Sequence, residues 1–312
     1  MKVAALDLGT NSFLCLVAEV ESGIIKQVYS DQVEIVRLGQ DVQKSKSFRP
    51  DALERARLCL ERFKQTIDLH KPEKVLAMAT SAARDVSNAF ELISIGKNLG
   101  IPIQIIPGER EAEITYKGAT SGLPQDKKRR AVIDIGGGST ELIAGAQGKI
   151  LGGESVNIGA VRLTELCFPT QPPTKSQIQS LKSYAEEKLE HLLKSIRNFQ
   201  VDELIAVAGT PTELAAAAIG QFDPKRIDGF QMNQQDLEDW CRKFAENSAK
   251  QRVQKFGISP GRADIILAGA LILEMILKGL GFQSLTVSTR GVRYGIALEM
   301  ENSSSFNSTS QF

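Results

Sequence analysis

Two short segments place an acidic residue, glycines and hydroxyl side chains directly after an apolar stretch. The first is Asp7–Ser12 (DLGTNS) and the second is Asp134–Glu141 (DIGGGSTE). Glycine lets backbone N–H groups approach an anion, and hydroxyls add donors, so each segment is typical of a phosphate-binding turn. An aspartate repels phosphate, so we expect Asp7 and Asp134 to hold a cation, or water on that cation, that in turn holds the phosphate.

The two segments are related by a constant spacing. Asp134 follows Asp7, and Ser139 follows Ser12, by 127 positions. One such turn alone is typical of an ordinary hairpin, but two copies at one spacing indicate a duplicated lobe with a cleft between the copies. Three consecutive glycines also raise the entropic cost of ordering a turn, which favours a functional reason for them.

Glu141 begins the strand that returns from the second turn. A hairpin places this residue beside Asp134, and two carboxylates at one end of a hairpin are suitable ligands for a hard divalent cation. The candidate metal ligands are therefore Asp7, Asp134 and Glu141. The candidate phosphate ligands in the two turns are Thr10, Asn11, Ser12, Gly136, Gly137, Gly138, Ser139 and Thr140.

Two further segments carry charged side chains at the start of a predicted helix. Ala79–Arg84 (ATSAAR) follows an apolar strand, and its hydroxyls, helix N-terminus and arginine suit an anion, although a lone arginine is typical of a protein surface. Gly108–Glu113 (GEREAE) places acidic residues in a first helical turn, where the helix dipole favours them. Taken alone, this second segment indicates no more than a helix start.

Together these segments resemble the exopolyphosphatase/guanosine pentaphosphate phosphatase (Ppx/GppA) family, which belongs to the actin, sugar-kinase and heat-shock-chaperone superfamily. The resemblance extends from Lys2 to about Met300. It implies an α/β fold of two ribonuclease-H-like (actin-like) lobes with a central cleft. It also implies Mg²⁺-dependent release of terminal phosphate from inorganic polyphosphate or from the 5′-triphosphate of guanosine pentaphosphate (pppGpp).

The resemblance also implies roles for individual residues. Glu111 matches the family's glutamate that polarises the attacking water, which makes it the predicted catalytic base. A carboxylate suits this role because phosphoryl transfer depends mainly on positioning and charge neutralisation. Arg84 matches an arginine that contacts phosphate. Glu109 and Glu113 lie two residues from Glu111 and therefore point elsewhere on the helix.

Other segments match the family less closely. Val207–Thr212 (VAGTPT) resembles a second glycine-rich loop, GGTATT, and makes Gly209 and Thr210 predicted substrate contacts, with an ordinary helix start as the alternative. Arg262 is a predicted polyanion contact, with surface or structural pairing as the alternative. The role of Arg290 stays open.

Three other functions fit parts of this pattern. Hydrolysis of pppGpp needs the same residues as hydrolysis of polyphosphate, and the sequence does not separate the two substrates. A kinase of the same superfamily would lack the glutamate of the Gly108–Glu113 segment. A non-catalytic sensor of polyphosphate or (p)ppGpp would not need Glu111, Asp134 and Glu141 together. We therefore expect an exopolyphosphatase-type hydrolase.

The elements that position these residues alternate between strands and helices. Apolar residues spaced by three and four predict helices over Asp51–Leu69 and Ser176–Phe199, and Lys2–Leu6 and Ala131–Ile135 are predicted strands. Two lobes follow, at 1–124 and 131–300. Residues 125–130 (QDKKRR) form a basic connector, either a solvated linker or a polyanion-steering patch, and residues 301–312 form a disordered tail.

Composition excludes several function classes. The 38 Lys and Arg nearly balance the 37 Asp and Glu, which rules out attachment to nucleic acid or acidic lipid by bulk charge. Two histidines cannot make a multi-histidine metal site. Asp7 interrupts the N-terminal apolar stretch, so we expect neither a secretory signal nor a membrane span. The four cysteines are expected to be buried thiols in the cytoplasm, and a homodimer is compatible with the resemblance.

Overall fold

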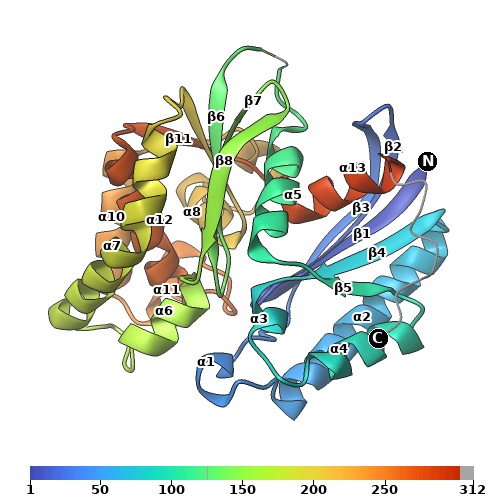
Figure 1. Ribbon diagram of the computed structural model, residues 1–312. Helices are drawn as coiled ribbons and strands as arrows, with labels where there is room; N and C mark the ends of the chain where they lie inside the picture. The colour runs from blue at the N-terminus through green and yellow to red at the C-terminus, as the bar shows by residue number, and fades with distance from the viewer. Residues whose placement is uncertain (125, 303–312) are drawn as a thin grey trace.

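Each glycine-rich turn joins the first two strands of a mixed sheet. We describe a computed structural model of the protein, in which residues 1–124 and 126–302 are placed (Figure 1). The first sheet has the strand order β3-β2-β1-β4-β5. Its strands are β1 (Lys2–Leu8), β2 (Ser12–Glu21), β3 (Ile24–Ile35), β4 (Lys74–Ala79) and β5 (Ile103–Ile105).

The second sheet repeats this arrangement and adds one strand. Its order is β10-β11-β9-β6-β7-β8. Both sheets run antiparallel across their first three strands and parallel across the next two pairings. The duplicated two-lobed α/β fold is thus confirmed. The strands are β6 (Arg129–Ile135), β7 (Thr140–Ala146), β8 (Lys149–Val156), β9 (Glu203–Val207), β10 (Gln231–Asn233) and β11 (Ser284–Val287).

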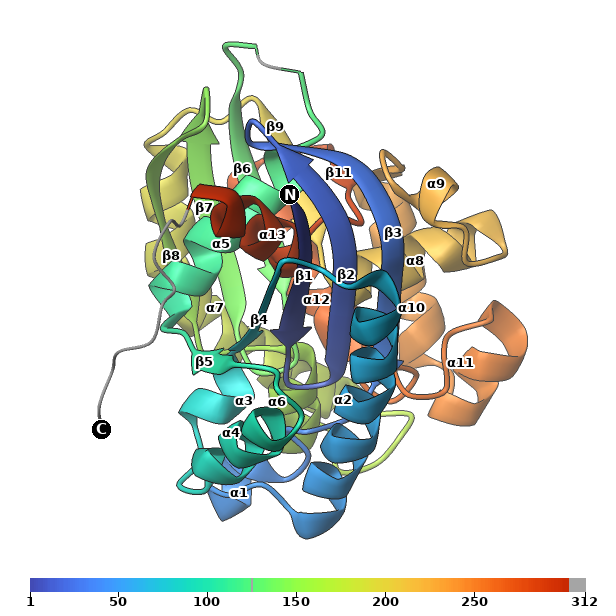
Figure 2. The same ribbon diagram turned by 90° about the vertical axis from the view of Figure 1, so that its right-hand side faces the viewer.

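Helices cover the outer faces of both sheets, and the last helix of each half lies between the sheets (Figures 1 and 2). In the first half they are α1 (Val42–Ser45), α2 (Pro50–His70), α3 (Ser81–Arg84), α4 (Ala89–Asn98) and α5 (Gly108–Thr120). In the second half they are α6 (Ala160–Cys167), α7 (Lys175–Arg197), α8 (Gly209–Ile219), α9 (Pro224–Ile227), α10 (Gln234–Ala245), α11 (Ala249–Phe256), α12 (Ile266–Leu280) and α13 (Val292–Asn302).

Apolar spacing and local capping explain the two long helices. Proline at the first position of α2 costs no hydrogen bond, and the helix buries Leu53, Leu60 and Phe63 on one face. Thr174 and Gln177 form a capping box at the start of α7, which satisfies backbone N–H groups that have no helical partner. Both helices occur within two residues of their predicted bounds.

The last helix of each half packs between the lobes. Helix α5 packs against the second sheet through Ala112, Tyr116 and Ala119. Helix α13 returns to the first sheet, where Ile296 and Met300 join its buried core. Figure 1 shows the two helices side by side between the sheets. A division at 124 and 131 therefore does not separate the packing units, because the chain's last helix belongs to the first lobe's core.

Other segments differ from the predictions. Arg129 and Arg130 lie in β6, and Arg130 pairs with Asp126 and Glu203, so the basic connector is shorter and its charge is partly compensated. Helix α10 ends at Ala245, and a capping box at Ser248 starts α11. Of the predicted tail, Glu301 and Asn302 belong to α13, and residues 303–312 lie outside the described residues.

The described residues contain no helix that is long and apolar enough to cross a membrane.

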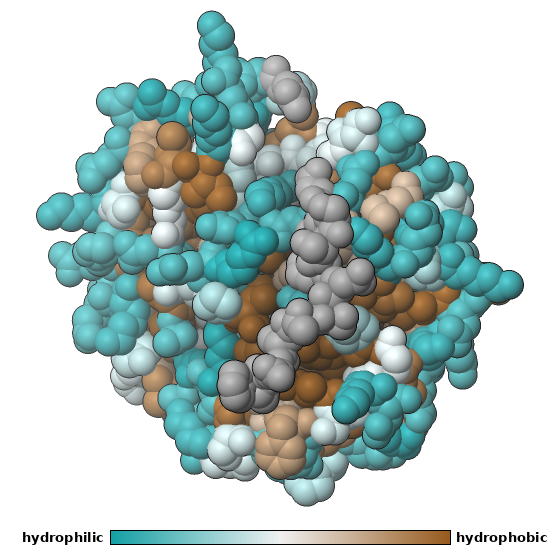
Figure 3. Space-filling model, turned by 45° about the vertical axis from the view of Figure 1, so that its right-hand side comes forward, coloured by the Kyte–Doolittle hydropathy of each residue, from teal (hydrophilic) through white to brown (hydrophobic). Residues whose placement is uncertain are grey.

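Cys15, Cys59 and Cys241 are buried free thiols as predicted, whereas Cys167 is half-buried. The face drawn in Figure 3 is largely hydrophilic, with apolar side chains gathered toward its middle.

Candidate active site

Site residues from both halves follow the carboxyl ends of strands. The turns follow β1 and β6, the α3 and α5 segments follow β4 and β5, and Gly209 and Thr289 come shortly after β9 and β11. The carboxyl ends of parallel strands lie at one edge of a sheet, and ligands of open α/β sheets bind there. The two edges face each other around a cavity of about 440 Å³.

Most predicted site residues line this cavity. They are Asp7, Thr10, Asn11, Ser12, Glu111, Asp134, Gly136, Gly137, Gly138, Ser139, Gly209, Thr210 and Arg262. Arg84, Thr140 and Glu141 are not among the lining residues. The Thr140 hydroxyl is fully buried and donates to the Ile158 carbonyl at 2.8 Å, so this side chain has a structural partner rather than access to the cavity.

The two glycine-rich turns have the same backbone hydrogen bond. The Gly9 N–H donates to the Ser12 carbonyl at 3.1 Å, and the Gly136 N–H donates to the Ser139 carbonyl at 3.0 Å. The second turn also comes very close to α3 of the first lobe, where Ser81 lies. A Cβ atom at Gly138 would lie 2.4 Å from the Ser81 Oγ atom, which no real side chain tolerates. Glycine is therefore required here by the approach of the other lobe, a reason that sequence alone did not supply.

The carboxylates of Asp7, Glu111 and Asp134 line the cavity, and that of Glu141 lies close enough to repel them. Asp134 pairs with Glu141 across the β6–β7 hairpin, as predicted. Burial, and then the charge of Glu111, raises the pKa of Asp134 to about 7. Burial raises the pKa of Asp7 and of Glu141 well above their usual range, and repulsion by Glu111 and Asp134 adds to both shifts. The cluster therefore favours bound protons or bound cations.

One oxygen of this cluster lacks a partner. The Ser155 hydroxyl donates to the Glu141 Oε1 atom at 2.6 Å, whereas the Glu141 Oε2 atom is buried without a hydrogen bond. An unpaired buried oxygen is costly, and a cation would satisfy it. No group of three or more His, Cys, Asp or Glu side chains among the described residues is arranged to hold a metal by itself. Mg²⁺ commonly binds one or two carboxylates and takes its other ligands from water and substrate phosphates, so the donors present fit that ion.

Glu111 lies in the first turn of α5 and faces the cavity. It is 6% exposed, and the Arg84 Nη1 atom donates to its Oε2 atom at 2.7 Å. Burial raises the pKa of Glu111, and Arg84 opposes this shift. The neighbouring acids are placed as predicted: Glu109 is exposed, and Glu113 pairs with Arg110 at 2.7 Å.

Arg84 differs from its predicted placement. Its Nη1 atom also donates to the Ile106 carbonyl at 2.9 Å, so the guanidinium lies against Glu111 rather than on the cavity surface. Direct contact of Arg84 with phosphate stays a prediction. The structure instead gives this residue a second role, since it orients Glu111 and favours its ionised form.

The Arg262 side chain reaches from the second lobe to the first. Its Nη2 atom donates to the Ser12 hydroxyl at 2.8 Å, and Glu213 lies 3.6 Å from its Nε atom. A Cβ atom at Gly209 would lie 1.4 Å from the Arg262 Nη1 atom, so glycine makes room for this guanidinium. Ala208 takes the glycine-like conformation at φ 74°, at a position where the resembling pattern has glycine.

Sequence reasoning missed a second group in the cavity wall. Arg293 makes two hydrogen bonds to Asp31, at 2.6 and 2.9 Å, and the Tyr294 hydroxyl donates to the same carboxylate at 3.0 Å. All three residues line the cavity, and the charge of Arg293 partly offsets the shift at Asp7. Arg290 lies outside the lining, 3.8 Å from Asp228. The basic sequence RGVR was the available signal, but it did not indicate which arginine faces the site.

The family model that matches residues 16–304 is that of the Ppx/GppA phosphatase family. The chain belongs to this family. As a Ppx/GppA phosphatase it is 35% identical to Exopolyphosphatase 2 of Mycobacterium tuberculosis, over 96% of this chain and 98% of that protein.

Two solved structures are also similar to this Ppx/GppA phosphatase. An exopolyphosphatase from Cytophaga hutchinsonii matches with a TM-score of 0.90 and 27% identity, covering 97% of this chain and 98% of that one. The Ppx/GppA enzyme of Aquifex aeolicus matches with a TM-score of 0.81 and 29% identity, covering 96% and 99%. The family resemblance is therefore confirmed over nearly the whole chain.

Proposed function

We propose that this phosphatase is an exopolyphosphatase, which releases orthophosphate from the end of inorganic polyphosphate. The observation that carries the proposal is a buried carboxylate, Glu111, that faces two opposed phosphate-type turns across one cavity. Full-length similarity to a relative named as an exopolyphosphatase supports it. The glutamate of the Gly108–Glu113 segment argues against a kinase of the same superfamily, and a sensor has no need of a base aimed at phosphorus.

In the proposed reaction, the two turns and Arg262 bind the terminal phosphate in the cavity. Glu111 orients a water molecule and accepts its proton as the water oxygen bonds to phosphorus. The phosphoanhydride bond breaks, and the electron pair leaves with the shortened chain. A divalent cation, which we propose is Mg²⁺ held by one or two of the predicted ligands Asp7, Asp134 and Glu141 together with water and substrate phosphates, would neutralise charge on the phosphates when bound.

The same site fits pppGpp as a second candidate substrate. The cavity is also lined by apolar and aromatic side chains, of which Val33, Ile35 and Phe222 are exposed. Polyphosphate has no group that needs such a surface, whereas a nucleoside does. A cytoplasmic location and a homodimer stay predictions.

Phosphate release from four substrates tests the proposal. Long polyphosphate, tripolyphosphate, pppGpp and ATP are compared with the purified chain and Mg²⁺. We expect release from polyphosphate, and a higher kcat/KM with pppGpp would make the nucleotide the substrate. Absence of release from all four would refute the hydrolase.

A separate experiment tests the cation. Excess chelator should abolish activity, and Asp134→Asn and Glu141→Gln should each raise the Mg²⁺ concentration needed for half-maximal rate and weaken Mg²⁺ binding in calorimetry. Glu109→Gln is the matched control, because this carboxylate is exposed. Full activity in chelator would refute the metal-dependent mechanism.

A further inference from the structure

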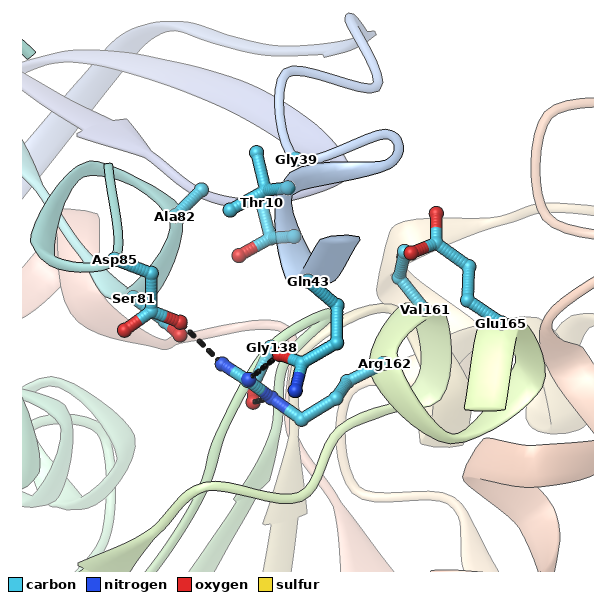
Figure 4. A pocket seen from close by; sticks show the side chains of 11 residues that line it. Thr10, Gly39, Gln43, Ser81, Ala82, Asp85, Gly138, Val161, Arg162 and Glu165 are labelled. Atoms are coloured by element: carbon cyan, nitrogen blue, oxygen red, sulfur yellow. Dashed lines mark hydrogen bonds and ion pairs between the residues drawn. The ribbon is translucent and has the colours of Figure 1, made fainter. Parts of the chain in front are cut away.

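Arg162 lies behind the second glycine-rich turn and does not line the large cavity. It belongs to the first turn of α6 and lines a smaller cavity of about 20 Å³ (Figure 4). The two cavities share Thr10, Ser81 and Gly138. The guanidinium is therefore separated from bound substrate by the turn itself.

Helix α6 provides hydrogen-bond donors for the carbonyl groups of the second glycine-rich turn. The Gly136 carbonyl accepts from the Ala160 N–H at 3.0 Å, and the Gly137 carbonyl accepts from the N–H groups of Val161 and Arg162 at 2.9 and 3.0 Å. The Gly138 carbonyl accepts from the Arg162 Nε atom at 2.7 Å. All three carbonyls thus point toward α6.

This orientation matters for anion binding. The carbonyl and N–H groups of neighbouring peptide units in a turn are fixed relative to one another, and a phosphate needs N–H groups, not carbonyl oxygens, on its side. Carbonyls held by α6 leave the opposite side of the turn, which lines the large cavity, free of them.

Arg162 also binds the other lobe. Its Nη2 atom forms an ion pair with Asp85, and its Nη1 atom donates to the Gln43 side chain, as Figure 4 shows. Asp85 directly follows α3, the segment that carries Ser81 and Arg84. The Arg162 side chain is only 12% exposed, so its hydrogen bonds are largely shielded from water.

We propose that Arg162 is a positioning residue, which fixes the Gly136–Ser139 turn for phosphate and holds the α3 segment of the first lobe against it. The activity arm of its test rests on the proposed function. A second ion pair across the lobes, between Arg37 and Asp264, does not touch the Gly136–Ser139 turn. It therefore serves as the matched control for tethering of the lobes alone.

The first measurement needs no substrate. Amide hydrogen exchange is followed over residues 136–140 in the wild-type protein, Arg162→Met and Arg37→Met. We expect faster exchange in this turn for Arg162→Met only, because the methionine keeps the length of the side chain but none of its donors. If Arg162→Met exchanges at the wild-type rate in this turn, or if its exchange is faster by the same factor throughout the chain, the proposal is wrong.

The second measurement uses polyphosphate hydrolysis. We expect kcat/KM to fall by about 10²-fold in Arg162→Met, since small displacements of positioning groups have effects of this size. Added guanidinium ion should restore part of the activity of Arg162→Met but not of Arg37→Met, and Arg162→Lys, which keeps the charge, should stay impaired. Equal losses in Arg162→Met and Arg37→Met, or full activity in Arg162→Lys, would overturn the positioning role. If the wild-type protein releases no phosphate, the proposed function fails, and the exchange measurement still decides the role of Arg162.

Discussion

Replacement of Glu111 by glutamine removes one buried negative charge and the proposed proton acceptor while keeping the volume of the side chain. The Arg84 guanidinium loses the negative charge of its partner at 2.7 Å, but the amide oxygen of glutamine can still accept from it and the Ile106 carbonyl at 2.9 Å is kept, so the local packing should survive. The neighbouring carboxylates should titrate closer to their usual range, because Glu111 raises the pKa of Asp7, Asp134 and Glu141.

The expected loss is in turnover, not in binding. General-base catalysis contributes about 10²–10⁴-fold, so kcat should fall by that factor, which is about 3–5 kcal/mol of activation free energy. Polyphosphate binding should stay the same or tighten, since a negative charge facing an anionic substrate has been removed.

Single-turnover phosphate release and equilibrium binding of polyphosphate separate these two effects. Glu113→Gln is the control, because its carboxylate lies two residues along the same helix and pairs with Arg110. Near wild-type turnover of Glu111→Gln, together with an inactive Glu113→Gln, would show that the base is assigned to the wrong residue. If both variants are active, the Gly108–Glu113 segment of α5 is an ordinary helix start and carries no catalytic base.

Three further predictions follow from the same contacts. Because burial raises the pKa of Asp7, Asp134 and Glu141, the folded chain binds more protons than the unfolded chain between the usual carboxyl pKa of about 4 and the value of about 7 for Asp134. The metal-free protein should therefore lose stability as pH rises through this range, and a higher Tm at about pH 8 than at about pH 5 in chelator would contradict the charge cluster. Arg84→Ala should shift the acid limb of the pH–kcat profile to higher pH, since Arg84 lowers the pKa of Glu111. An unchanged acid limb would show that the Arg84–Glu111 pair does not set the pKa that limits activity. Gly209→Ala should displace Arg262 from Ser12 and raise KM about 10–100-fold, the value of one charge-assisted hydrogen bond, with little change in Tm; an unchanged KM would remove Arg262 from the binding site.

Some parts of the fold were predictable because the signal lies within one element or one turn. Apolar spacing located α2 and α7, since a helix face repeats every three to four residues. The hairpin between Asp134 and Glu141 needs only a turn between two apolar strands, and it occurs as predicted. Strand β8 (Lys149–Val156) was missed because Gly152 and Gly153 weaken the strand pattern, while Gly153 lies against the Ile143 backbone of β7, where a Cβ would clash.

The contacts of the site depend on residues far apart in the chain. Arg84 and Glu111 are 27 positions apart, Arg162 and Asp85 are 77 apart, and Arg262 and Ser12 are 250 apart. No local periodicity records such pairs, so the sequence indicated the chemistry of these side chains without indicating which of them meet.

The sequence by itself determined the two turns, the acidic, glycine and hydroxyl residues in them and the duplicated α/β lobes, because these are properties of short segments and of one repeated spacing. The tertiary structure decided that Arg84 binds Glu111, that Asp31 and Arg293 join the cavity wall, and that α13 completes the first lobe. The physical reason is that a side chain's role depends on its burial and its charged neighbours, and both are set only when the two sheets pack against α5 and α13.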